Sequence, residues 1–270
     1  MFIPLEDDLS DIVGKAQRGL EISDSQLAER ANVSLQQVQE IRSGGFNAVV
    51  VARIASVLQL NAEALVDAGR KAWIPELVEP IEGLAAFNTP FDEMTVNSYL
   101  IWDPETSRAA AFDTGSDCIE LLDFIKQQQL HLDAIFLTHT HGDHIFDLDR
   151  LKIHTGATVF VSKRERVEGA HPFEEGRRFE VGKLRLEPRL TWGHSKGGMT
   201  YFVTGLASPI AVVGDALFAG SMGGGKVSYR DALRTNREQI LTLPEETVLC
   251  PGHGPMSTVR EEKRHNPFFA

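Results

Sequence analysis

Cysteine is scarce in this sequence, since only Cys118 and Cys250 occur among 270 residues. The two lie far apart and form no Cys-x-x-Cys pair, so the sequence favours neither a disulfide framework nor a zinc site built from thiolates. We expect both to be buried side chains.

Long apolar runs are absent as well. No stretch is long enough to span a bilayer, and residues 1–4 do not read as a basic and apolar leader. We therefore expect a soluble, cytoplasmic protein with no membrane role.

Basic residues are outnumbered, with 27 Lys and Arg against 38 Asp and Glu, which gives a net charge of −11. An acidic protein repels phosphates on average, so the composition disfavours nucleic acid as the main partner. A local basic groove is compatible with this balance.

The length suits one domain of about 200 residues plus a small one. Residues 1–70 form the small domain, 71–80 a connector with Trp73, Pro75 and Pro80, and 81–270 the large domain. Apolar spacing predicts helices over 9–19, 35–42, 48–58 and 62–68, and one that starts at the capping sequence 23–26.

Residues 26–44 resemble the helix-turn-helix domains of phage-repressor-like regulators, whose second helix reads the major groove. Charge opposes that function, because residues 1–70 hold six basic and ten acidic side chains. The reading helix would offer Gln36, Gln37, Gln39, Glu40 and one cation, Arg42. We expect that DNA is not a partner and that these helices mediate homo-oligomerisation or pack on the large domain.

Four side chains able to bind metal fall within six residues, at His139, His141, Asp143 and His144. The apolar run 134–137 before them predicts a strand, so they would emerge at a strand end. A spacing of two does not match the helical zinc motif His-Glu-x-x-His. The alternative is a polar turn in which Asp143 caps the next helix, but three histidines in six positions favour a metal site.

This run, His-x-His-x-Asp-His, resembles the signature of metallo-β-lactamase-fold hydrolases, and the resemblance continues at residues 193–194, 214–215 and 251–253. It implies that one metal is held by His139, His141 and His194, and a second by Asp143, His144 and His253, with Asp215 bridging both. Asp143 and Asp215 are then the catalytic carboxylates. The implied cofactor is two divalent ions, zinc first, with iron or manganese as alternatives. The resemblance also places Asp113 beside the metals, where it would orient a ligand histidine.

Strand patterns are predicted at 84–87, 94–102, 108–113, 157–161, 178–181, 184–190, 199–203, 210–213 and 247–250, the last strand. Helices are predicted at 117–129, 147–155 and 231–242, and residues 163–178 read as a charged surface segment. With each ligand at a strand end, this order predicts an α/β protein with an αββα sandwich, preceded by the small all-α domain.

Residues 214–221 and 261–268 resemble short glyoxalase-II-type enzymes, which implies hydrolysis of a small-molecule thioester such as S-lactoylglutathione or a related S-acyl thiol. The nucleophile would be a hydroxide that bridges the two ions. Two departures weaken a glutathione assignment. Residues 223–226 replace the usual Gly-Arg, and the 17 residues that follow His253 leave no room for the helical glutathione-binding domain of the longer enzymes. Lys226, Lys263 and Arg264 are candidate cations for an anionic substrate, or else solvated surface charges.

Three other functions stay open. A persulfide dioxygenase would hold a single iron on His139, His194 and Asp215. An N-acyl lactone hydrolase would share both metals, and a transcriptional regulator would use the large domain as a sensor. Nucleases of this fold carry large insertions that this length excludes.

Overall fold

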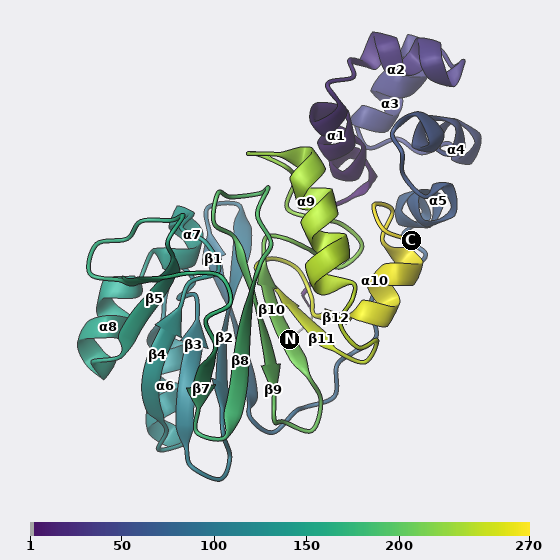
Figure 1. The fold of residues 1–270 in the computed structure, drawn as a ribbon. Coiled ribbons are helices and arrows are strands. Elements are labelled where there is room, and N and C mark those ends of the chain that lie inside the picture. The colour runs from purple at the N-terminus through teal and green to yellow at the C-terminus, as the bar shows by residue number, and fades with distance from the viewer. Residues whose placement is uncertain (1–2) are drawn as a thin grey trace.

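The computed structural model describes residues 3–270 and begins with five short helices (Figure 1). They are α1 (Leu9–Leu20), α2 (Asp24–Ala31), α3 (Leu35–Arg42), α4 (Ala48–Val57) and α5 (Ala62–Arg70). Ser23 forms a capping box with Gln26, and Ser34 forms one with Gln37, so α2 and α3 start where the sequence predicts. Asn32 ends α2 in the left-handed region, which makes the turn to α3 tight.

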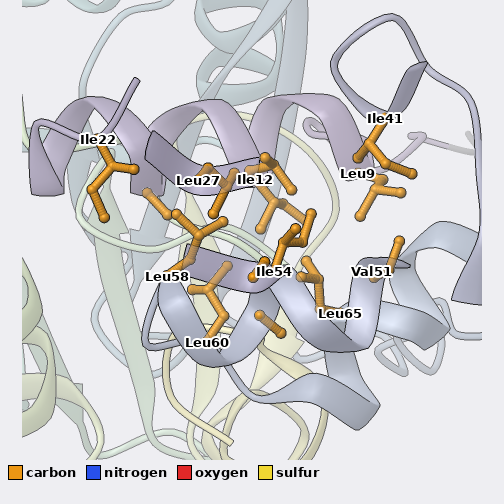
Figure 2. Packing of buried hydrophobic residues seen from close by; sticks show 14 of the residues in the cluster. Leu9, Ile12, Ile22, Leu27, Ile41, Val51, Ile54, Leu58, Leu60 and Leu65 are labelled. Atoms are coloured by element: carbon orange, nitrogen blue, oxygen red, sulfur yellow. The ribbon is translucent and has the colours of Figure 1, made fainter. Parts of the chain in front are cut away.

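These helices enclose an apolar core that extends into the rest of the chain. Figure 2 shows aliphatic side chains from all five helices and the adjoining turns pointing into it. The same cluster contains four buried residues from distant parts of the sequence, Met222, Tyr229, Ala232 and Phe268. The N-terminal helices therefore pack against the second half of the chain.

Residues 71–83 connect the helices to two six-stranded sheets and form no regular structure. The first sheet, in spatial order, contains β1 (Leu84–Phe91), β2 (Met94–Trp102), β3 (Arg108–Phe112), β4 (His131–Phe136), β5 (Thr158–Ser162) and β6 (His171–Phe173). The second runs from β12 (Ser257–Thr258) through β11 (Val248–Pro251), β10 (Ile210–Gly214), β9 (Met199–Thr204) and β8 (Leu184–Leu190) to β7 (Phe179–Val181).

The two sheets pack face to face around an aromatic centre. The rings of Phe112, Phe136 and Tyr201 lie 5.2 to 5.6 Å apart between their centroids. Two helices, α6 (Ile119–Gln127) and α8 (Leu148–Thr155), cover the outer face of the first sheet. The outer face of the second is covered by a π-helix (Asn236–Ile240) and α10 (Val259–His265), while α9 (Tyr229–Thr235), which leads into the π-helix, packs against the N-terminal helices (Figure 1). The predicted αββα sandwich preceded by helices is confirmed.

Some elements differ from the sequence prediction. The helix expected over 231–242 is α9 followed by the π-helix, which begins at Asn236, where the buried side-chain amide donates to Ala216 O at 2.6 Å. The strand at 247–250 is not the last one, since β12 pairs with it over two residues. The segment 163–178 contains β6, which pairs parallel with β5. Strands of two or three residues are too short to show an alternating pattern.

Helix α10 was also missed, although a local sequence pattern predicts where it begins. Thr258 and Glu261 form a capping box whose spacing can be read directly from the sequence.

Candidate metal centre

All seven predicted ligands follow the carboxyl ends of strands. Residues 139–144 come after β4, His194 after β8, Asp215 after β10 and His253 after β11. Strands β3 and β4 pair in parallel, as do β10 and β11, so their carboxyl ends meet at the same edge of each sheet. A short helix, α7 (Gly142–Ile145), turns the chain there.

The first ligand group contains His139, His141, His194 and Asp215, whose donor atoms all lie within 4.8 Å of one another. His141 Nδ1 lies 2.9 Å from His139 Nε2 and 3.1 Å from His194 Nε2. Asp215 Oδ2 lies 3.3 Å from His194 Nε2. Three imidazole nitrogens and a carboxylate oxygen thus face one point.

The second group contains Asp143, His144 and His253, also within 4.8 Å of one another. Asp143 Oδ2 lies 3.2 Å from His253 Nε2 and 3.5 Å from His144 Nε2. Asp215 stands between the groups, because its Oδ1 lies 3.2 Å from His144 Nε2 and its Oδ2 lies 3.6 Å from His253 Nε2. Asp215 can therefore serve both groups.

Protein acceptors hold the far nitrogen of three of these rings. His144 Nδ1 donates to Asp113 Oδ2 at 2.8 Å, His194 Nδ1 donates to Gly223 O at 2.5 Å, and His253 Nδ1 donates to Thr95 O at 2.6 Å. Each ring must then present Nε2 without a proton when it is neutral. This is the tautomer that a metal ligand requires.

Thr138 fixes the fourth ring. Its Oγ1 donates to Asp113 Oδ2 at 2.6 Å, so it accepts from His139 Nδ1 at 3.1 Å, and His139 Nε2 faces the centre. Asp113 Oδ1 also accepts from the Thr138 backbone N at 2.7 Å. Asp113 thus supports two predicted ligands, and its φ of 57° suits an aspartate better than most side chains.

Charges divide the centre into two parts. Burial lowers the pKa of His139, His141 and His194, so these rings are neutral near pH 7. Burial also disfavours charge on His144 and His253, but the neighbouring carboxylates outweigh it and raise the pKa of these rings to about 10 and about 11. A cation binding at the second group would displace these protons.

Within residues 3–270, two buried atoms at the middle of the centre, His144 Nε2 and Asp215 Oδ1, form no hydrogen bond, although they lie 3.2 Å apart. Buried polar atoms in proteins are nearly always paired, so these two call for another ligand. Imidazole nitrogens with carboxylate oxygens are a donor set for zinc, iron or manganese. The residues present therefore fit divalent metal ions.

Glycines leave room for the ligands. A Cβ at Gly252 would come within 2.2 Å of Asp215 Oδ1 and 2.5 Å of His144 Cε1. The Pro-Gly-His turn after β11 therefore needs glycine to let the two ligand groups approach each other.

The three candidate substrate cations fall in different places. Lys226 lies near enough to His141 and His194 for its charge to help lower their pKa, after the larger effect of burial. Lys263 lies on α10, where its ammonium is 3.7 Å from Glu245. Arg264 follows it on the same helix and makes no hydrogen bond or ion pair with residues 3–270. Only Lys226 is brought close to the ligands.

Sequence reasoning missed the supporting acceptors. Gly223 and Thr95 act through backbone carbonyls, which carry no side-chain signal. Glu165 lies in the segment predicted to be plain charged surface, yet it accepts hydrogen bonds from Thr140 Oγ1 and from Gly197 N at 2.9 Å. It thereby joins the two turns that carry His141 and His194.

No helix within residues 3–270 is both long and apolar enough to cross a membrane. Residues 91–253 match the model of the metallo-beta-lactamase superfamily. The helices α1 to α5 lie outside this match.

Three known proteins illustrate the similarity. A "probable metallo-hydrolase YqgX" of Bacillus subtilis is 29% identical over 206 residues, covering 67% of this chain and 95% of that protein. The hydroxyacylglutathione hydrolase GloC of Haemophilus influenzae is 28% identical over 205 residues, covering 67% and 95%. The crystal structure of TTHA1623 in a di-iron-bound form is 26% identical with a TM-score of 0.56, covering 68% of this chain and 100% of that one.

These relatives support a metal-dependent hydrolase, and the groups of histidines and aspartates are a candidate site for divalent ions. With the family match over more than half of its length and the ligand turns at the ends of its strands, this chain belongs to the metallo-β-lactamase superfamily.

Proposed function

We propose that this protein is a dinuclear metal-dependent hydrolase of a thioester, such as S-lactoylglutathione or a related S-acyl thiol. One observation carries the proposal: seven donor atoms from four strand-end turns converge in two groups that share Asp215. His139, His141 and His194 would hold one ion and Asp143, His144 and His253 the other. Zinc is our first expectation for the metal, with iron or manganese as alternatives.

Two divalent ions bound here would lower the pKa of a water molecule and polarise a carbonyl oxygen. The chain's contribution is to fix the donor atoms before a substrate arrives. Asp113, Thr138, Gly223 and Thr95 hold the far sides of four rings. Since these contacts already exist, binding does not require the ligands to reorganise.

Two further side chains suit a thioester with an anionic end. Lys226 places a positive charge beside His141 and His194. The Phe218 ring meets the His253 ring edge-on with centroids 5.6 Å apart and gives the centre an apolar wall. The hydroxyacylglutathione hydrolase among the relatives supports the same substrate class.

The test is a substrate panel assayed with protein of defined metal content. S-lactoylglutathione, other S-acyl thiols, N-acyl lactones and persulfides are compared, with oxygen consumption recorded for the persulfides. We expect a thioester to be hydrolysed fastest and no oxygen to be consumed. Oxygen uptake with about one iron per chain would instead establish the dioxygenase, and lactone hydrolysis alone would establish the lactonase.

Lys226→Ala refines this test. It should raise KM for an anionic thioester and leave KM for a neutral one nearly unchanged, because only the former needs the cation. Lys126→Ala is the matched control, since Lys126 is exposed on α6, on the other side of the sandwich.

A further inference from the structure

The segment after Asp215 is held by helix α1, which lies outside the family match. Met222 is fully buried and belongs to the apolar core of the N-terminal helices. The next residue, Gly223, supplies the carbonyl that accepts the Nδ1–H of the predicted ligand His194. One short stretch of backbone therefore joins the helical core to the metal centre.

The ammonium group of Lys15 on α1 holds this stretch in place. Its ammonium donates to Met222 O at 2.8 Å across 207 residues of sequence, and it forms an ion pair with Asp7. Asp7 in turn accepts a hydrogen bond from Ser221 Oγ. The side chains of Lys15 and Asp7 are only 14% and 7% exposed, so water screens the pair weakly.

The ammonium also lies 5.0 Å from the centre of the Phe218 ring, which is a favourable distance for a cation over an aromatic face. Lys15 thus contacts residues on both sides of the bend between Phe218 and Met222. Ser221 and Phe218 exchange backbone hydrogen bonds of 3.0 and 3.1 Å that close this bend.

The stretch has little room to move. A Cβ on Gly223 would lie 2.0 Å from Asp215 O and 2.9 Å from His194 Nδ1, so the backbone already touches both predicted ligands. His194 Nδ1 lies 2.5 Å from Gly223 O and 3.3 Å from Gly224 O, so a shift of Met222 would displace both carbonyls of this stretch and weaken the pairing of the buried Nδ1–H. Leaving such a donor unpaired is costly, so the ring would reorient.

We propose that Lys15, paired with Asp7, is a positioning residue for the metal centre, through which helix α1 controls how firmly the ion at His194 is retained. The inference rests on the metal centre of the proposed function but not on its substrate. It makes the N-terminal helices part of the hydrolase rather than a separate binding module.

The experiment uses the full chain, stripped of metal and reloaded with cobalt(II). The rate at which cobalt passes to excess chelator and the visible absorption of the cobalt protein are measured for Lys15→Met, Lys15→Arg and Asp7→Asn. Arg18→Met is the matched control, because Arg18 is an exposed cation one turn further along α1. Thermal unfolding of each metal-free protein is recorded alongside.

We expect Lys15→Met to speed cobalt loss about tenfold, the lower end of what removing an outer partner of a metal ligand does. Its cobalt absorption should change as well. Asp7→Asn should also speed cobalt loss. The double variant Lys15→Met/Asp7→Asn should lose cobalt only slightly faster than Lys15→Met alone, because the two side chains act through one connection. Lys15→Arg should restore most of the retention, and Arg18→Met should match the wild type.

Cobalt loss at the wild-type rate in Lys15→Met would overturn the inference, even if the metal-free variant melts at a lower temperature. If Lys15→Met does not fold, Asp7→Asn, which keeps the size of its side chain, decides in the same way. A wild type that binds no cobalt refutes the proposed function itself. A wild type that binds cobalt but cleaves no thioester refutes only the substrate, and the rates still decide the role of Lys15.

Discussion

Asp113 Oδ2 accepts the Nδ1–H of His144 at 2.8 Å, and both side chains are buried, His144 completely. The same oxygen accepts from Thr138 Oγ1, which holds His139. One carboxylate outside the two ligand groups thus orients a ring in each of them. Removing this carboxylate should therefore weaken metal binding at both positions.

Asp113→Asn tests this relationship. Asparagine tolerates the positive φ of residue 113, so the backbone can stay in place. The amide supplies only one acceptor oxygen, and we expect metal affinity to fall about 10- to 100-fold. Metal titration against a chelator measures it. Asp117→Asn, an exposed residue nearby in the sequence, should bind metal like the wild type.

The purified protein should carry about two transition-metal ions per chain, because the donor atoms form two groups around Asp215. Elemental analysis gives the stoichiometry and the metal. Stripping the metal should lower the melting temperature, since ions that bind only the folded chain stabilise it. A reproducible value near one, with iron dominant, would favour the dioxygenase.

Asp215→Ala and His141→Ala should each reduce thioester hydrolysis by more than about a hundredfold. The first removes the carboxylate shared by both groups, and the second removes a nitrogen within 3.1 Å of two other ligands. Circular dichroism should show that both variants remain folded. Near-native rates in both would place the chemistry elsewhere.

Glu262 should make stability depend on pH. It is fully buried, and burial raises its pKa to about 7 although Asn266 and Gly220 donate hydrogen bonds to it. The folded chain therefore binds this proton more tightly than the unfolded chain, whose carboxyl has a pKa of 4.5. The stabilisation is complete below pH 4.5 and is lost as pH rises to about 7.

The rise in the pKa of Glu262 from 4.5 to about 7 corresponds to about 3 kcal/mol in the free energy of unfolding. Glu262→Gln cannot ionise, so it should gain about that much stability relative to wild type between pH 4.5 and 8. Urea unfolding of both proteins across this range measures the difference. A constant difference between the two curves would show that Glu262 keeps an ordinary pKa.

The N-terminal helices should not bind duplex DNA, despite their repressor-like order. Arg42, the one cation of the would-be reading helix, donates to Ser10 O, and Arg53 donates to Asn32 O at 3.1 Å. These contacts leave few cations for phosphates. Titration of the full-length chain with random-sequence duplex at low salt should show no salt-sensitive affinity, and such affinity would restore the regulator hypothesis.

Sedimentation of the same samples tests the expected homo-oligomer. The intact chain is the right material, because deleting the helices would expose Met222, Tyr229 and Phe268, which are buried in the shared core.

The sequence alone was enough to predict most elements in their order and to name the candidate ligands, although β6, β12 and α10 were missed. Caps such as Ser23 with Gln26 act over three residues, and alternating strands such as 184–190 carry their own pattern, so both can be read locally. The ligands follow strands in short turns, which makes His139, His194, Asp215 and His253 visible as motifs.

What only the tertiary structure decided is how those ligands are held. The acceptors Gly223 O and Thr95 O are backbone atoms, and any residue type could provide them. The contact between Lys15 and Met222 joins positions 207 apart, and no local pattern encodes such a pair. Sequence periodicity reports which face of an element is buried, whereas the partner of that face is chosen only when the chain closes on itself.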